Sequence, residues 1–224
     1  MGNEIFFLMD VVGVTVFTLL AARFGKEALT ASIALNAILA NLFIAKQMVF
    51  FGCTVTCSDV FIVGSLFGLN LLQEFYGKSA AKKATNISFV ALLFFLFVSQ
   101  VHLWFYPASM DQTQDAFETI LSWTPRIVVS SLIVYFLVQK IDVFFFGILK
   151  NLFQGKILPF RITCSLVLSQ GIDTALFSFL GLYGIVSSIW DVMIVSFLVK
   201  CLVILASAPI SIFARRFMKA AHEV

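Results

Sequence analysis

The sequence predicts a polytopic all-α membrane protein with about seven transmembrane helices. Three observations lead to this fold class: 61% of the 224 residues are hydrophobic, only 12% are charged, and the apolar residues gather in long continuous segments. A soluble domain has about 45–50% apolar and about 25% charged residues, and a transmembrane helix needs about 20 apolar residues. The composition therefore excludes a soluble globular enzyme, a disordered chain and a disulfide-rich secreted module.

Seven apolar segments make up one transmembrane domain over residues 1–224. They are continuously apolar rather than alternating, which favours helices over the strands of a membrane barrel. The first segment is expected to remain in the mature protein, because it lacks a basic start and carries Asp10 in its middle. The spans are predicted at about 4–22, 29–51, 59–77, 85–106, 124–149, 161–183 and 190–214.

Basic residues occur in every second connection between these spans. They follow the first, third, fifth and seventh spans, whereas the other connections carry no Lys or Arg. Because basic connections stay in the cytoplasm, we expect the N-terminus to lie outside and the C-terminus inside. The basic residues are Arg23, Lys26, Lys78, Lys82, Lys83, Lys150, Lys156, Arg161, Arg215, Arg216 and Lys219.

Several polar side chains fall inside the spans, where a charge at the bilayer centre costs about 2.5–3.5 kcal/mol. Their spacing places them on single helical faces, so we expect them to point into the bundle and line a polar cavity. Two cations, Arg126 and Lys200, accompany them. The stripes are Asn70, Gln73 and Glu74 in the third span, Tyr135, Gln139 and Asp142 in the fifth, and Gln170 and Asp173 in the sixth.

Structural roles are the alternative for the same residue types. Asp173 and Lys200 could form a buried ion pair that only holds the sixth and seventh spans together. Asn36 and Asn41 are expected to make hydrogen bonds between helices. The other charged residues in or beside the spans are expected to cap helices or to lie at the interface, where lysines extend to the nearer surface. They are Asp10, Asp59, Asp191, Lys46 and Lys140.

The sequence carries no motif for metal binding, nucleotide binding or catalysis. Cys53-x-x-x-Cys57 and the two other cysteines are best explained as small apolar side chains. There is no phosphate-binding loop or dinucleotide fingerprint, and the only histidines are His102 and His222. We therefore expect no enzyme, no metal and no cofactor. The net charge of +3 comes from the basic connections and does not indicate nucleic-acid binding.

The residue types in the stripes indicate what such a cavity would bind. Carboxylates accept hydrogen bonds, lysine and arginine donate them, and amides do both. A planar heterocycle with adjacent N–H donors and a carbonyl, such as a guanine-like base, matches this set, and aromatic side chains supply faces for stacking. A vitamin or an amino acid matches it equally well, so the chemistry alone predicts only a small polar molecule.

Four motifs occur in order over about residues 35–215. They are Asn41…Lys46…Phe51 with N-L-L-Q-E-F-Y-G from Asn70 to Gly77 and A-A-K-K from Ala80 to Lys83; Arg126 with Y…Q-K-I-D-V-F-F from Tyr135 to Phe145; S-Q-G-I-D-T from Ser169 to Thr174; and Lys200. Together they resemble the queuosine precursor transporter family, also called the vitamin uptake transporters. One departure is Asn70, where that family usually has Asp.

The resemblance implies a fold similar to the six-helix substrate-binding subunits of energy-coupling-factor transporters, preceded here by one N-terminal helix. It implies a multi-pass importer of the bacterial inner membrane for 7-deazaguanine bases (preQ0, preQ1 or queuine), which feed the queuosine modification of tRNA. The small-molecule substrate and the lipid bilayer are then the expected partners. An ATPase partner is not required, and the sequence leaves open whether the chain forms a homodimer.

On this interpretation ten residues form the substrate-binding site. Asp173 and Glu74 are expected to accept hydrogen bonds from the N–H edge of the base, and Gln170 and Gln139 to complete the in-plane hydrogen bonds. The other members line the site, and the two cations among them balance the buried charge or contact the carbonyl. These other members are Asn70, Gln73, Arg126, Tyr135, Asp142 and Lys200.

The main alternative is a binding module, namely the substrate-binding subunit of an energy-coupling-factor-type vitamin transporter. Such a subunit needs a partner membrane helix and ATPases, and could dock on them through small residues such as Ala28 and Ser32. A structural scaffold would explain the ion pairs but not the amide-rich stripes. Uptake by the chain expressed alone distinguishes an importer from a binding module.

Overall fold

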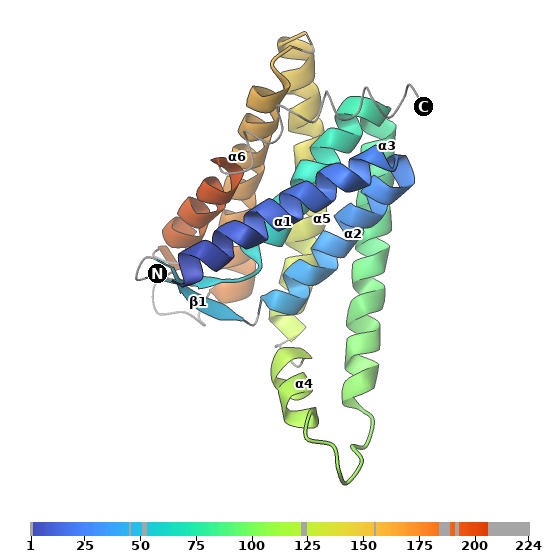
Figure 1. The fold of residues 1–224 in the computed structure, drawn as a ribbon, viewed down its shortest axis with the longest axis vertical. Coiled ribbons are helices and arrows are strands. Elements are labelled where there is room, and N and C mark those ends of the chain that lie inside the picture. Colours follow the sequence, from blue (N-terminus) through green and yellow to red (C-terminus); the bar gives the residue numbers. More distant parts are fainter. Residues whose placement is uncertain are drawn as a thin grey trace.

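The structure is a computed structural model that describes residues 2–44, 46–50, 53–121, 125–154, 156–183, 189–190 and 193–205. In these ranges the regular structure is helical, as predicted, apart from one short hairpin (Figure 1). The helices are α1 (Asn3–Arg23), α2 (Lys26–Phe43), α3 (Asp59–Leu103), α4 (Gln114–Leu121), α5 (Pro125–Leu152), α6 (Leu158–Phe177), the π-helix η1 (Ser178–Leu182) and a last helix, Met193–Leu205. Strands β1 (Gln47–Phe50) and β2 (Cys53–Thr56) pair antiparallel, with Gln47 opposite Thr56.

Four helical segments in the described ranges are long and apolar enough to cross a membrane, which confirms a multi-pass membrane protein. They are Asn3–Arg23, Asp59–Leu103, Val129–Leu152 and Leu158–Gly181. Helix α2, with 18 residues, is long enough but not apolar enough to be counted with them. The last helix, Met193–Leu205, is too short within the described part of the chain. The predicted number of seven spans therefore stays a prediction, and residues 206–214 of the seventh lie outside the described residues.

Helix α3 consists of two arms that meet at Gly77. This residue has φ 85° and ψ 170°, a conformation that a glycine adopts without strain. In Figure 1 the first arm rises to a bend at the upper right of the molecule, and the second arm runs back down beside it. The two arms correspond to the predicted third and fourth spans. The predicted connection over 78–84 is wrong, because the chain becomes helical again directly after the bend at Gly77.

The predicted second span, 29–51, ends early. Helix α2 stops at Phe43, and the chain then forms the β1–β2 hairpin before α3 begins. The hairpin is rich in β-branched residues, which favour strands. The backbone N–H of Cys57 donates to the carbonyl of Lys46 (2.9 Å) and closes its base, while the Asn3 side chain donates to the carbonyl of Val49 (2.9 Å). The hairpin thereby fixes where α3 starts.

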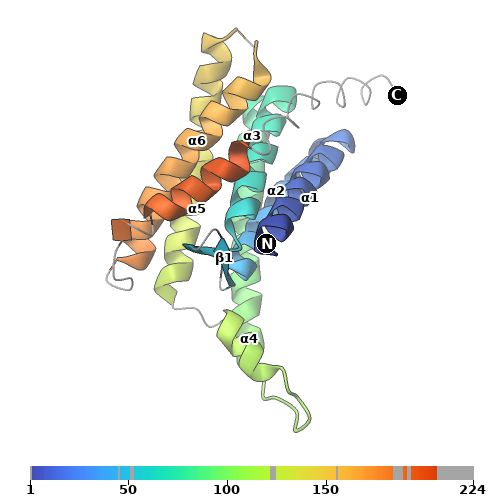
Figure 2. The same ribbon diagram turned by 60° about the vertical axis from the view of Figure 1, so that its left-hand side comes forward.

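The connections divide into two groups at opposite ends of the bundle (Figures 1 and 2). One end, here called the basic end, has the α1–α2 turn at 24–25, the bend at Gly77 and the α5–α6 connection at 153–157. The other, here called the hairpin end, has β1, β2 and α4. This grouping agrees with the alternation of basic and non-basic connections in the sequence. Which end faces the cytoplasm stays a prediction.

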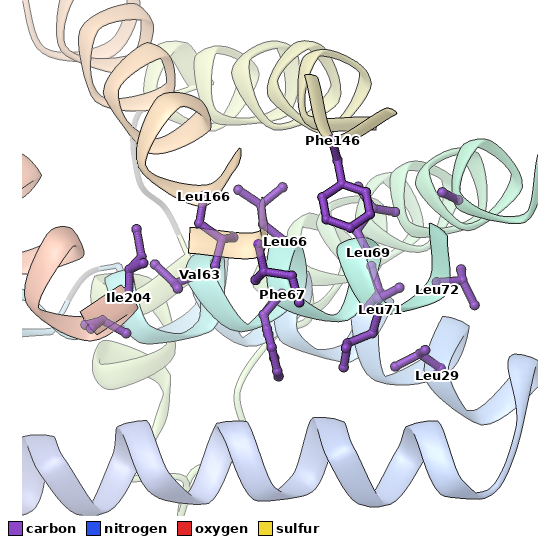
Figure 3. Packing of buried hydrophobic residues seen from close by; sticks show 14 of the residues in the cluster. Leu29, Val63, Leu66, Phe67, Leu69, Leu71, Leu72, Phe146, Leu166 and Ile204 are labelled. Carbon is purple, nitrogen blue, oxygen red and sulfur yellow. The ribbon is translucent and has the colours of Figure 1, made fainter. Parts of the chain in front are cut away.

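The first arm of α3 forms the centre of the hydrophobic core (Figure 3). Its leucines and Phe67 pack between α1 and α2 on one side and α5, α6 and the last helix on the other. Two glycines permit this close packing: a Cβ atom at Gly64 would lie 2.4 Å from Val14 Cγ1, and one at Gly68 would lie 3.0 Å from Ile33 Cγ1. Polar side chains on this arm consequently face other helices and not lipid.

Candidate functional site

A cavity of about 140 Å³ lies in the half of the bundle nearer the hairpin end. It is formed by α2, the start of α3, α5, α6 with η1, and the last helix. Its wall combines an apolar part, which includes Phe177, with many hydrogen-bonding groups. The polar members are Asn41, Ser58, Asp59, Ser131, Tyr135, Asp173, Thr174, Ser178, Ser196 and Lys200.

Lys200 holds the charged part of the cavity together. Its Nζ donates to Asp173 Oδ2 at 2.5 Å and to Thr174 Oγ1 at 3.2 Å, and it lies 3.7 Å from Asp59 Oδ1. All four side chains are buried, and Asp59 Oδ2 has no hydrogen bond of good geometry to any described residue. Two carboxylates thus face a single ammonium group. This arrangement leaves spare acceptor capacity and suits a ligand that brings N–H donors.

A second group of polar side chains continues from the cavity toward the basic end. The hydroxyls of Tyr135 and Ser65 lie 3.3 Å apart, and Gln139 Nε2 donates to Ser65 Oγ at 3.1 Å. Ser65 Oγ also lies 3.2 Å from the carbonyl of Ile33 and donates to it. Ser65 therefore links the wall of the cavity, through Tyr135, to the amide of Gln139 deeper in the bundle.

Beyond Gln139 lies a fully buried amide and carboxylate layer. Asp142 Oδ1 accepts hydrogen bonds from Ser165 Oγ (2.6 Å) and Ser169 Oγ (2.7 Å). The side chains of Asn70 and Gln170 have no hydrogen bond of good geometry to any described residue, and the same holds for Asp142 Oδ2. Each unsatisfied buried polar group costs about 1–3 kcal/mol. Packing alone does not account for so many hydrogen-bonding groups in one layer.

An ion-pair network closes the basic end of this polar column. Arg161 donates through Nη1 and Nη2 to the two carboxylate oxygens of Glu74, each at 3.0 Å, and through Nε to the carbonyl of Lys156 at 2.9 Å. Lys150 Nζ lies 3.4 Å from Glu74 Oε2 and donates to the Glu74 carbonyl at 3.0 Å. Sequence analysis placed Arg161 among the connecting residues as a cytoplasmic anchor. The structure instead puts it in the first turn of α6, fully buried, because that helix begins at Leu158.

The structure distributes the ten predicted site residues along this column. Three of them, Tyr135, Asp173 and Lys200, line the cavity. Glu74 lies apart from it, paired with Arg161. Arg126 belongs to α5, but its side chain lies outside the described part of the chain. The remaining five are buried between the cavity and the basic end: Asn70, Gln73, Gln139, Asp142 and Gln170.

Sequence reasoning did not select Asp59, Ser65 or Arg161. Asp59 was assigned to a helix cap or the interface, yet it is 5% exposed and faces Lys200. Its position depends on the hairpin that precedes α3, and the sequence analysis did not predict that hairpin. The signal in the sequence that could have indicated Asp59 is its position at the start of an apolar segment, because a carboxylate in a membrane span is unusual.

Several of the structural expectations are confirmed in the described residues, but Asn36 is buried and its Nδ2 has no hydrogen-bond partner there, so its expected interhelical hydrogen bond stays a prediction. Ser131 Oγ donates to Asn41 Oδ1 at 3.1 Å and joins α5 to α2, as expected for an interhelical asparagine. The Asp173–Lys200 ion pair exists, but it also lines the cavity. Lys140 is exposed, as a lysine that extends to the surface should be. Asp191 lies outside the described residues.

Comparison with known proteins gives two matches. The family described as "Putative vitamin uptake transporter" matches residues 56–214. A protein of Bacillus subtilis (strain 168) described as "Probable queuosine precursor transporter" is 32% identical over 222 residues, which cover 97% of this chain and 96% of that protein. No solved structure matches the chain.

Proposed function

The chain belongs to the vitamin uptake transporter family, and from this premise we propose that it imports a 7-deazaguanine precursor of queuosine across the bacterial inner membrane. The observation that carries the proposal is the cavity in which Lys200 faces the carboxylates of Asp59 and Asp173. The name of the Bacillus subtilis relative supports the class of substrate. The choice among preQ0, preQ1 and queuine is left to experiment.

The cavity suits the edge of a guanine-like ring. We assign to Asp173 the role of accepting hydrogen bonds from the ring N–H and the neighbouring exocyclic amine. Lys200 and Asn41, which line the same cavity, are the donors for the adjacent carbonyl. The Phe177 side chain supplies an apolar surface for the ring plane. Adenine presents an acceptor where guanine presents the ring N–H, so this site should reject it.

The polar column beyond the cavity gives the route inward. When the helices separate, a base leaving the cavity would meet the amides of Gln139, Asn70 and Gln170 and the carboxylate of Asp142. These groups would form hydrogen bonds with the base, and those hydrogen bonds would compensate for the cost of burying the groups away from water. The ion pair between Glu74 and Arg161 would then act as the closure at the basic end and not as a ligand of the base.

The test is equilibrium binding to the purified chain, measured as thermal stabilisation and by calorimetry. We expect preQ0, preQ1 or queuine to bind, and adenine, thiamine and biotin not to bind. Asp173→Asn should weaken binding about 10- to 100-fold, whereas Asp111→Asn, a matched change at an exposed loop aspartate, should leave it intact. Binding of a vitamin with no binding of any deazaguanine would overturn the substrate class and favour the vitamin-binding subunit.

A further inference from the structure

A second pocket lies on the outside of the bundle, between the second arm of α3 and the middle of α5. Its volume is about 340 Å³, and it shares no lining residue with the cavity around Lys200. Its rim carries three exposed lysines, Lys78, Lys82 and Lys140, together with the amide of Asn86. We call it the lysine groove. None of its described lining residues is acidic, so it presents an uncompensated positive charge.

Two of the lysines are positioned by aromatic rings. Lys140 Nζ lies 3.9 Å from the centroid of the Phe136 ring, and Lys78 Nζ lies 5.5 Å from that of Phe144. Such cation–π contacts are attractive and restrict where the lysine side chain lies. Thr85 does not add a donor, because its hydroxyl already donates to the carbonyl of Ala81 at 3.1 Å. The donors of the groove are therefore the three ammonium groups and the Asn86 amide.

The groove continues into an exposed apolar surface along the second arm of α3. From Lys82, exposed residues follow at intervals of four along the second arm of α3: Asn86, Val90 and Phe94. A spacing of four keeps them on one helical face. The sequence of this face is thus charged and polar near the basic end and apolar further from it.

Helix α5 repeats this pattern on the opposite wall. From Lys140, the exposed residues Leu137, Ile133 and Val129 follow at intervals of three or four in the direction of the hairpin end. Val90 and Phe94 are 64% and 67% exposed, and Val129 is 52% exposed. Both walls therefore carry cations nearer the basic end and an apolar face that continues toward the hairpin end. A phospholipid has the matching order, with a charged headgroup followed by apolar acyl chains.

We propose that the lysine groove binds the phosphate of an anionic phospholipid, with the acyl chains along the apolar faces of α3 and α5. Basic pockets between transmembrane helices on the cytoplasmic side are suited to anionic headgroups, and each lysine near such a surface adds to the attraction. Lys78 directly follows the bend at Gly77, so the groove lies toward the basic end, which the charge pattern assigns to the cytoplasmic leaflet. The proposal does not depend on which small molecule is carried.

The experiment compares lipids and variants on the purified full-length chain. Native mass spectrometry and thermal unfolding would be recorded with phosphatidylglycerol, with phosphatidylcholine and with soluble sn-glycerol 3-phosphate. The groove variant is Lys78→Gln with Lys82→Gln and Lys140→Gln, and the charge-matched control is Lys26→Gln with Lys83→Gln and Lys156→Gln. We expect wild type and control to retain phosphatidylglycerol in preference to phosphatidylcholine. The groove variant should lose at least about tenfold in that preference, because lysines near an anionic surface attract it and three of them are removed.

Other outcomes contradict the proposal. An unchanged lipid preference in the groove variant would overturn it, as would an equal loss in groove variant and control, which would indicate general surface charge. Equal stabilisation by sn-glycerol 3-phosphate would assign the groove to a soluble anion and not to a lipid. If the triple variant does not fold, the single change Lys82→Gln decides the same question against Lys83→Gln, because both side chains are exposed on the same helix.

Discussion

At the scale of single residues, the cavity depends on one lysine shared by two carboxylates from different helices. Asp59 comes from the start of α3 and Asp173 from α6, whereas Lys200 lies on the last helix. In a medium of low dielectric constant such a cluster is stable only when its charges remain close together. Each member therefore has a structural role besides the binding role that we propose, and substitutions must be chosen to separate the two.

Asp173→Asn is expected to reduce uptake about 10- to 100-fold while the protein still inserts in the membrane. The amide retains the size of the side chain, but it exchanges one acceptor for a donor and removes a charge-assisted hydrogen bond of about 1.5–3 kcal/mol. Uptake of labelled base by cells with equal amounts of protein in the membrane measures the effect. Asp111→Asn is the control, and near-normal uptake by the Asp173 variant would contradict the assignment.

Glu74→Gln tests the closure at the basic end. The change leaves the buried guanidinium of Arg161 without its ion-pair partner, which we expect to cost about 3 kcal/mol, the lower end for breaking a buried pair, because Glu74 is partly exposed. The unfolding temperature of the purified protein should fall markedly. Glu118→Gln, on the exposed helix α4, is the control. An unchanged unfolding temperature for the Glu74 variant would show that the ion pair does not stabilise this end.

At the scale of elements, the bend of α3 is set by backbone conformation. Gly77→Ala is expected to destabilise the protein by about 1–3 kcal/mol, because alanine is strained at φ 85° and ψ 170°. A Cβ atom there would meet no other atom within 4 Å, so sterics with neighbours do not contribute. Gly13→Ala, also in open space but inside α1, should be neutral or stabilising. Equal unfolding temperatures of the two variants would contradict this explanation.

The apolar pattern of the sequence predicts most of the helices but not the hairpin. Apolar length was enough to predict α1, both arms of α3, α5 and α6, although the second arm of α3 begins directly after Gly77 and not at the expected residue 85. The hairpin could not be predicted in this way, because residues 44–56 are as apolar as the helix before them. Its strands are specified by pairing and by the contact of Asn3 with Val49, which no local pattern reveals.

For the site, helical spacing predicted which side chains share a face but not which helices meet. The stripe on α5 does face the bundle, since Tyr135, Gln139 and Asp142 are all buried. The partner of Glu74 was missed because Arg161 is close to a connection and resembled an ordinary cytoplasmic anchor. Contacts between distant helices require the tertiary arrangement, and this is why Asp59 and Arg161 emerged only from the structure.

At the scale of the whole molecule, the two ends of the bundle should face opposite sides of the membrane. In a variant with its four cysteines changed to alanine, a single cysteine at Ser109 or at Asn151 reports each end, and both positions are exposed. A membrane-impermeant maleimide should label Ser109→Cys in intact cells and Asn151→Cys only after permeabilisation. The reverse pattern would show that the basic end faces outward and would contradict the charge-based orientation.

As an importer, this chain should bring a 7-deazaguanine base into the cell without any dedicated partner protein. The most direct measurement expresses it in a bacterium that can neither make nor import queuosine precursors, supplies one base at a time and quantifies queuosine in tRNA. For queuine, the host must also contain an enzyme that inserts that base. We predict that at least one base restores queuosine with the wild-type chain, and that queuosine forms at least about tenfold more slowly with Asp173→Asn. No queuosine with any base, although the protein is present in the membrane, would contradict the account.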